Sequence, residues 1–263
     1  MAPGNKSLDV AAYLERINYK GPIEPALETL RALHKAHHLA VPFENLDIHL
    51  GEEISLDEAA LFDKIVKRRR GGFCYEMNGL FAALLRRLGF SVTMLSAGVI
   101  NRDGSFGPEF DHMALMVQLQ ERWLADVGFG DSFREPLRLD EEGEQVEETF
   151  AYRIIREGEK LILQRREGKS KWDDQYIFTL EPRSMNDYAA MCRYHQTSPE
   201  SHFTQKRICS LATPEGRVSL SDMRLIVTKG TERQESIIET ASLYALALRR
   251  HFGMEVDVEK LLS

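Results

Sequence analysis

The chain has few cysteines, and this limits the cysteine chemistry available to it. Its 263 residues include only three, Cys74, Cys192 and Cys209, at spacings that form no CxxC pair. An odd number of cysteines in this arrangement indicates neither a disulfide framework nor a zinc ribbon. We therefore expect any cysteine chemistry to come from a single thiol.

Long apolar runs and an excess of positive charge are also missing. No segment approaches the roughly 18 apolar residues of a transmembrane helix, and the N-terminal segment has no hydrophobic signal core. The 34 Lys and Arg against 41 Asp and Glu give a formal net charge of −7, which disfavours nucleic acid or an acidic membrane surface as a partner. These absences predict a cytoplasmic protein that binds neither nucleic acid nor a membrane.

The hydrophobic pattern changes its period at Gly89, and this change predicts the fold class. The segment from Tyr75 to Leu88 has a nearly ideal helical stripe that ends at Gly89. Ser55 and Glu58 match a capping box for an earlier helix, and a final helix is expected from Gln234 to Phe252. The other expected helices span 10–17, 25–38 and 56–67, and the expected strands lie in 91–100, 112–119, 122–129, 150–166, 172–180 and 207–228. Helices, then strands, then a mixed tail predict an α+β fold with three regions.

Cys74 is the residue most suited to chemistry. It follows Arg70, two glycines and Phe73, and it stands at the start of the strongest predicted helix. Free backbone N–H groups and the helix dipole favour a thiolate there. A lone cysteine is commonly an inert buried residue, but a helix start preceded by two glycines favours the nucleophile.

A thiol nucleophile needs a base and a group that orients this base. His112 opens one predicted strand, and Asp126 is an acid inside an otherwise apolar strand. A tight turn near Gln120 and Glu121 leaves Asp126 about three residues, roughly 10 Å, from the position opposite His112. Contact therefore requires a longer turn, a bulge or marked coiling. The alternatives are a histidine bonded to backbone and an acid beside a turn.

Two further groups of residues have a plain and a functional interpretation. His34, His37 and His38 have the helical spacing of a metal site but no acidic or thiol companion, so no metal is predicted. Arg70 would find a partner in Glu44 or Asp47, and such a pair would fix the loop that presents Cys74. The alternative for Arg70 is a solvated basic run with its two preceding arginines.

Four segments, VPFENLDI, RGGFCYEMNGLF, DHMALMV and DVGFG, resemble the arylamine N-acetyltransferase family in order and spacing. The resemblance covers nearly the whole chain, since YHQTSPESHF and EGRVSL are similar to the family's entry to its third domain. It implies a cysteine-protease-like arrangement: a helical bundle (1–90), an antiparallel β-barrel (91–192) and an α/β lid (193–263). It also implies a triad of Cys74, His112 and Asp126.

The resemblance further implies acetyl-CoA as donor, an arylamine or arylhydrazine as acceptor, and no metal. Phe43 and Phe129 match positions that line the family's acceptor pocket, and Arg70 with Glu44 or Asp47 matches its support of the active-site loop. For coenzyme A only regions follow, namely the cleft beside the third region and the loop that contains Gly104, Ser105, Phe106 and Gly107. We expect a ping-pong reaction through acetyl-Cys74 in a monomer or weak homodimer.

Two other classes of protein compete with this prediction. A papain-like or transglutaminase-like thiol hydrolase could use the same three residues. However, the papain signature is absent, and the 112 − 74 = 38 residues between Cys74 and His112 are far fewer than the roughly 130 of that family. A catalytically silent ligand-binding relative would have lost one member of the triad, whereas all three are present.

Overall fold

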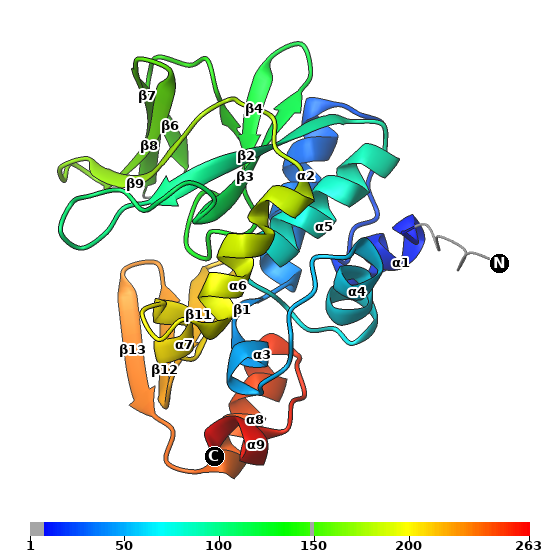
Figure 1. Cartoon of the computed structure of the whole chain (residues 1–263), viewed down its shortest axis with the longest axis vertical. Helices are drawn as coiled ribbons and strands as arrows, with labels where there is room; N and C mark the ends of the chain where they lie inside the picture. The colour runs from blue at the N-terminus through cyan, green and yellow to red at the C-terminus, as the bar shows by residue number, and fades with distance from the viewer. Residues whose placement is uncertain (1–7, 148–149) are drawn as a thin grey trace.

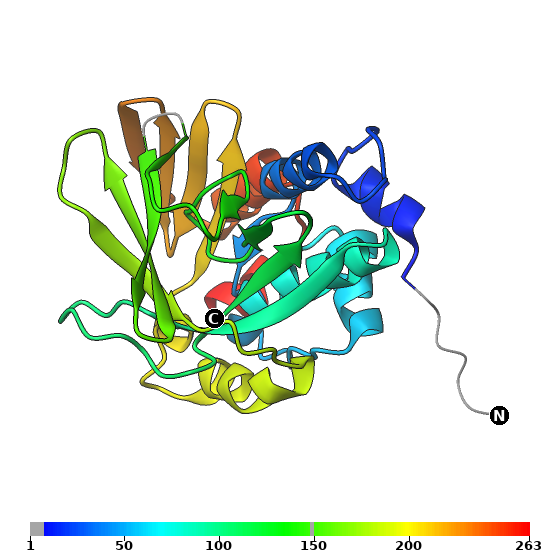
Figure 2. The same ribbon diagram turned by 90° about the horizontal axis from the view of Figure 1, so that it is seen from above.

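The structure, a computed structural model, describes residues 8–147 and 150–263. Most helices lie on one side of the molecule, and most strands of two antiparallel sheets lie on the other (Figures 1 and 2). The α-helices are α1 Val10–Arg16, α2 Leu27–Ala40, α3 Leu46–His49, α4 Glu58–Phe62, α5 Cys74–Arg87, α6 Ala189–Thr197, α7 His202–Gln205, α8 Ala241–Ala247 and α9 Val258–Leu262. Two short π-helices, η1 Asp63–Lys67 and η3 Leu248–Phe252, continue α4 and α8, and a 3-10 helix, η2 Met185–Tyr188, precedes α6. Within the described ranges, no helix has the length and apolar character needed to cross a membrane.

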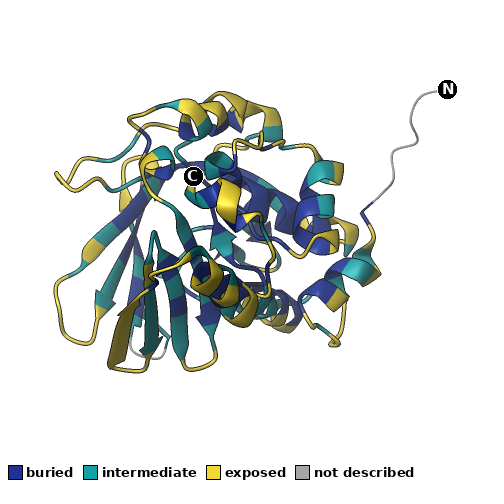
Figure 3. Ribbon diagram, turned by 90° about the horizontal axis from the view of Figure 1, so that it is seen from below, coloured by how far each residue is buried: buried dark blue, intermediate teal, exposed yellow. Residues whose placement is uncertain are grey.

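Helix α5 lies at the centre of the molecule. Every residue from Cys74 to Leu85 is buried, and the helix ends just before Gly89, whose φ of 89° suits glycine. Figure 3 shows buried residues concentrated along this helix and the strands beside it. The predicted apolar stripe is therefore correct, although the helix is buried all round rather than on one face.

The predicted capping box of Ser55 and Glu58 is wrong. Helix α4 begins at Glu58, and its N-cap is Asp57, whose carboxylate accepts hydrogen bonds from the backbone N–H groups of Ala59 and Ala60. The Ser55 hydroxyl instead accepts from the N–H of Asp57. An aspartate directly before the helix reaches the free N–H groups more easily than a serine two residues further away.

The larger sheet has the strand order β5-β4-β3-β2-β9-β8-β7-β6, with all neighbours antiparallel. Its edge strands β5 and β6 are joined by a side chain, because the amide of Gln145 accepts from the N–H of Arg138 and donates to its C=O. This contact nearly closes the sheet into a barrel and agrees with the predicted fold class. The strands are β2 Ser91–Val99, β3 His112–Gln118, β4 Arg122–Ala125, β5 Leu137–Arg138, β6 Gln145–Glu147, β7 Phe150–Glu157, β8 Lys160–Glu167 and β9 Asp173–Phe178.

The smaller sheet contains a strand from the N-terminal part of the chain. Its order is β1-β10-β11-β12-β13, and β1, Phe43–Glu44, pairs with β10 through Phe43 opposite Ser210. The VPFENLDI segment therefore lies against the C-terminal region. The remaining strands are β10 Ile208–Thr213, β11 Gly216–Ser221, β12 Arg224–Lys229 and β13 Glu232–Ile237.

The prediction of a final helix from Gln234 to Phe252 is wrong in its first part. Gln234 lies in β13, and α8 begins at Ala241 after the N-cap Thr240. All residues of β13 are exposed at the edge of the sheet, so the strand has no buried face to give its sequence a period of two. Hydrophobic alternation could not reveal this strand.

Candidate active site

Cys74 is held at the start of α5 by close backbone packing. Cys74 is only 3% exposed to solvent. A Cβ atom on Gly71 would lie 1.9 Å from the carbonyl oxygen of Pro42, and one on Gly128 would lie 2.8 Å from the Cα of Cys74. Only glycine fits at such distances, so Gly71 lets Pro42 approach the loop before the cysteine and Gly128 lets its own segment approach Cys74.

His112 and Asp126 are in direct contact. The Nε2 atom of His112 lies 2.7 Å from Oδ2 of Asp126, and both side chains are buried. Asp126 does not lie within a strand as predicted, because β4 ends at Ala125. The pairing of Gln118 with Arg122 leaves a loop longer than a tight turn, and the chain leaves the sheet at Asp126. These two features bring the carboxylate to the histidine.

Asn78 joins the helix that begins at Cys74 to the acid. Its amide nitrogen donates to Oδ1 of Asp126 at 2.8 Å and to the C=O of Met113 at 2.6 Å. Its oxygen accepts from the N–H of Val127 at 2.9 Å. Sequence reasoning missed this residue, although a fully buried asparagine inside an apolar stripe is costly unless it is bonded. That polar exception was the available signal.

Two histidines of α2 hold the backbone of Asp126. The N–H of Asp126 donates to Nε2 of His34 at 3.0 Å, and Nε2 of His38 donates to the C=O of Asp126 at 3.1 Å. His34 is fixed in turn because its Nδ1 donates to the C=O of Arg134. Burial lowers the pKa of His34 to about 4 and the pKa of His38 well below its ordinary value, so both rings are neutral at pH 7.

The third histidine of this helix has a different partner. Nδ1 of His37 lies 2.9 Å from the hydroxyl of Tyr13. In the described part of the chain, no group of His, Cys, Asp and Glu side chains could hold a metal ion. The helical spacing of His34, His37 and His38 therefore serves hydrogen bonds between α2 and its neighbours.

The acid and the thiol have opposite tendencies to ionise. Burial alone would raise the pKa of Asp126, but His112, the Asn78 amide and the N–H of Gly128 outweigh it and hold this pKa below its ordinary value. Burial raises the pKa of the Cys74 thiol well above its ordinary value, and the nearby Asp111 and Asp126 carboxylates add to this rise. The carboxylate is therefore ionised at pH 7, while the thiol keeps its proton until a base accepts it.

A buried ion cluster supports the loop that precedes Cys74. The guanidinium of Arg70 donates from Nε to Glu44 at 3.0 Å and from Nη2 to Asp47 at 2.6 Å. Lys64 lies 2.7 Å from Asp47 and 2.8 Å from Glu76. The second oxygen of Glu76 accepts from the N–H of Phe73 at 3.1 Å. The cluster thus reaches the residue before the cysteine, and sequence reasoning had missed Lys64 and Glu76.

Glu76 has a raised pKa within this cluster. Burial raises its pKa to about 7, although the ammonium group of Lys64 opposes this rise. Arg16 adds a second support from α1, because its guanidinium donates to the backbone C=O groups of Ala40, Ile65 and Arg70. The chain before Cys74 is therefore held by both side-chain charges and backbone hydrogen bonds.

Cys74 and His112 share one cavity of about 320 Å³. Phe43 and Phe129 line it too, and the Phe129 ring stands edge-on to the His112 ring with centroids 5.2 Å apart. The other lining residues are Val99, Asp111, Gly128, Gly130, Asp131, His202, Phe203, Ile208, Ser210 and Ser219. The structure thus brings the predicted acceptor-pocket residues together with the thiol.

The loop predicted to contact coenzyme A lies outside this cavity. Gly104, Ser105, Phe106 and Gly107 are not among the lining residues. The loop folds back on itself, since the N–H of Gly107 donates to the C=O of Val99 at 2.7 Å and Phe106 bridges to Ile100. Val99 itself lines the cavity, so the loop is connected to the cavity wall through this hydrogen bond.

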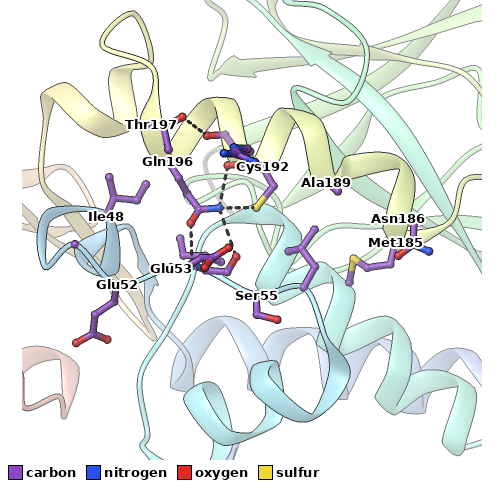
Figure 4. Close-up of a pocket in the computed structure, with 14 residues that line it drawn as sticks. Ile48, Glu52, Glu53, Ser55, Met185, Asn186, Ala189, Cys192, Gln196 and Thr197 are labelled. Carbon is purple, nitrogen blue, oxygen red and sulfur yellow. Dashed lines mark hydrogen bonds between the residues drawn. The ribbon is translucent and has the colours of Figure 1, made fainter.

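A larger hollow of about 670 Å³ lies between α6 and the chain that follows α3 (Figure 4). Cys192 lines it, and the Gln196 amide donates to the Sγ and the C=O of Cys192 and accepts from the N–H of Ile54. Cys209 is fully buried in β10. Neither cysteine shares a cavity with Cys74 among those described here.

A thiol at a helix start, a buried His–Asp pair and an α+β scaffold are typical of cysteine-dependent enzymes. Comparison with known proteins narrows this class. The sequence model of a family described as N-acetyltransferase matches residues 26–261. The arylamine N-acetyltransferase of Escherichia coli (strain K12) is 35% identical over 253 residues, which cover 94% of this chain and 89% of that protein. The enzyme of that name from Mycolicibacterium smegmatis is 35% identical over 257 residues, covering 95% and 93%.

Solved structures agree with the sequence relatives. The arylamine N-acetyltransferase of Salmonella typhimurium has a TM-score of 0.90 at 33% identity and covers 96% of both chains. The Mycobacterium marinum enzyme in complex with CoA has a TM-score of 0.89 at 32% identity and covers 96% of this chain and 97% of its own. This chain therefore belongs to the arylamine N-acetyltransferase family, as the resemblance predicted.

Proposed function

We propose that this enzyme transfers an acetyl group from acetyl-CoA to the nitrogen of an arylamine or arylhydrazine through an acetyl-Cys74 intermediate. The observation that supports this most strongly is the shared cavity of Cys74 and His112, with His112 bonded at 2.7 Å to the buried Asp126. Nucleophile, base and orienting acid are the parts that thiol-based acyl transfer requires.

In the first half-reaction, His112 takes the proton of Cys74 as the sulfur attacks the thioester carbonyl. The raised pKa of the buried thiol makes this base necessary. The C–S bond of the thioester then breaks, and coenzyme A leaves as a thiol with the proton from His112. Asp126 stabilises the imidazolium that exists between these steps. The backbone N–H of Cys74, in the first turn of α5, is the first candidate to stabilise the oxyanion.

In the second half-reaction, the acceptor nitrogen attacks the acetyl-Cys74 carbonyl. An arylamine suits this step because its nitrogen is largely unprotonated at pH 7. His112 accepts the proton released from nitrogen and returns it to the departing sulfur of Cys74. Phe43 and Phe129 give the cavity aromatic walls that favour flat acceptors.

Coenzyme A binding by this chain is also part of the proposal. The CoA complex of the Mycobacterium marinum relative supports it. We keep the cleft beside the C-terminal region as the expected site, together with the loop of Gly104, Ser105, Phe106 and Gly107. This loop is hydrogen-bonded to Val99, which lines the cavity, but the four loop residues do not line it themselves.

Mass spectrometry of the acetylated enzyme tests the proposed function. We expect acetyl-CoA without acceptor to add one acetyl group to the peptide that contains Cys74. The adduct should be absent from Cys74→Ala and should disappear from the wild type when an arylamine is added. Cys192→Ala is the matched control, because Cys192 lies in another cavity, and it should still acetylate. An adduct on a different residue, or none at all, would contradict the proposal.

A further inference from the structure

The cavity that contains Cys74 has an unbalanced charge. Two carboxylates, Asp111 and Asp131, are among its lining residues, whereas none of the described lining residues is a lysine or an arginine. His202 also lines the cavity, but burial lowers its pKa, so its ring adds no positive charge at pH 7. Apart from Cys74 and His112, the remaining lining residues are aromatic, aliphatic, glycine or serine and supply no cation.

The two carboxylates differ in their partners. Asp131 lies 3.0 Å from Nε of Arg217 and 3.3 Å from Nη1 of Arg165, so its charge is offset. Asp111 forms no ion pair with a lysine or arginine of the described residues. Its nearest cationic candidate is His195, whose Nε2 lies 3.3 Å away, and it also accepts from the N–H of Val99.

Asp111 is ionised and reachable from the cavity. The contact with His195 and the N–H of Val99 outweigh burial and hold the pKa of Asp111 below its ordinary value. Its side chain is 19% exposed, and it directly precedes His112 in the sequence. A carboxylate in this place acts on any group that an acceptor carries beyond its reacting nitrogen.

We propose that Asp111 selects acceptors by charge, so that the enzyme prefers arylamines with a cationic or hydrogen-bond-donating ring substituent and disfavours those with a ring carboxylate. This inference rests on the proposed acetyl transfer and names the acceptor class for the same site. The physical basis is Coulomb attraction and repulsion in a cavity with apolar walls, where charges act more strongly than in water. Phe43, Phe129 and Phe203 supply such walls.

The test compares two acceptors of similar shape, 4-aminobenzamidine and 4-aminobenzoate, in wild type and Asp111→Asn. We measure kcat/KM for each and take the ratio of cation to anion. We expect Asp111→Asn to lower this ratio by at least about tenfold, since one unit charge a few ångströms away acts on both acceptors in opposite senses. The different basicities of the two amines cancel when the ratios of wild type and variant are compared.

Glu109→Gln is the matched control. It removes the same charge two residues away, but the Glu109 side chain is 68% exposed, and Glu109 does not line the cavity. We expect its ratio to equal that of the wild type. If the cation-to-anion ratio of Asp111→Asn lies within about twofold of the ratios of the wild type and of Glu109→Gln, the proposal is overturned.

A measurement on the wild type alone guards against a variant that fails to fold. Benzamidine should inhibit discharge of the acetyl-enzyme at lower concentration than benzamide, and benzoate should inhibit least. Equal inhibition by the three, or strongest inhibition by benzoate, would contradict charge selection by Asp111. Failure of the proposed function would be separate, because no acetyl group would then form on Cys74 before any acceptor is added.

Discussion

Buried polar groups lie on both sides of Cys74, and the two sets differ in charge. On the side of the preceding loop, the cluster consists of ionisable side chains: Glu44, Asp47, Lys64, Arg70 and Glu76. On the side of Asp126, the supports are the neutral side chains of His34, His38 and Asn78. Both sets are almost inaccessible to water.

The two sets of buried groups perform different tasks. Opposite charges hold the loop firmly, because removing one partner leaves another buried charge unpaired. Neutral hydrogen bonds hold Asp126 without adding a competing charge near His112. Asp126, the carboxylate bonded to the His112 ring, is therefore held by uncharged groups. The predictions below alter one set or the other.

The largest effect is expected from Asp126→Asn. An asparagine that turns its NH₂ group toward His112 favours the tautomer with the proton on Nδ1, which cannot accept the thiol proton. One that turns its NH₂ group the other way sets it against the donors Asn78 and Gly128. We expect the rate of Cys74 acetylation to fall by about 10⁴-fold, as for the analogous change in a serine triad. Stopped-flow release of coenzyme A measures it.

An exposed carboxylate provides the comparison for that variant. Asp140 pairs with Arg122 at the surface, and Asp140→Asn should leave the acetylation rate unchanged. An equal rate for Asp126→Asn and the wild type would show that Asp126 is structural.

Arg70→Met should affect stability more than chemistry. Among the described residues it leaves Glu44 and Asp47 with Lys64 as their buried cation, and loss of one partner of a buried pair costs about 3–5 kcal/mol. At about 2–4 °C per kcal/mol, we expect the melting temperature to fall by roughly 10 °C. Calorimetry of Arg68→Met, which removes an exposed partner of Asp63, should show a change of at most about 2 °C. Equal melting temperatures for the two variants would reject the role of the cluster in holding the loop.

His34→Gln should slow acetylation by about tenfold, the equivalent of one hydrogen bond to the Asp126 backbone. His37→Gln is a close control, because His37 is equally buried in the same helix but bonds to Tyr13. Single-turnover rates with stability measured in parallel distinguish the two. We expect both variants to lose stability and only His34→Gln to lose rate. A similar loss of rate in both would mean that α2 acts through general packing.

The smallest effect concerns pH. The folded pKa of Glu76, about 7, lies above its ordinary value of 4.5, so ionisation destabilises the folded state as pH rises from about 5 to 8. The Glu76→Gln variant has no carboxyl group at this position, so it does not lose stability in this way as pH rises. The difference in melting temperature, variant minus wild type, should therefore become more positive across this range. A constant difference would show that Glu76 does not titrate there in the folded state.

Short-range patterns predicted much of the fold. The helix from Cys74 and the change of period after Gly89 follow from local spacing and glycine positions. The exposed strand at Glu232–Ile237 did not, because no buried face marks it. The division into regions at residues 90 and 192 stays a prediction.

The site was predictable where one residue breaks a pattern, as Asp126 does in an apolar run. Its supports were not, because they come from distant parts of the chain. Asn78 lies 48 residues from Asp126, and His34 lies 92 residues away. Their roles depend on how α2 and α5 pack against the end of β4, and local sequence does not contain that information.

The amount of coenzyme A released before any acceptor is present tests the central claim most directly. Enzyme in known concentration is mixed with excess acetyl-CoA, and free thiol is followed in time. We predict a rapid burst of one equivalent per enzyme that stops until an arylamine is added and is absent from Cys74→Ala. Continuous release without acceptor would show that water discharges the acetyl-enzyme, and it would contradict a transfer that waits for an amine. No release until the acceptor is added would indicate direct transfer and would contradict an acetyl-Cys74 intermediate.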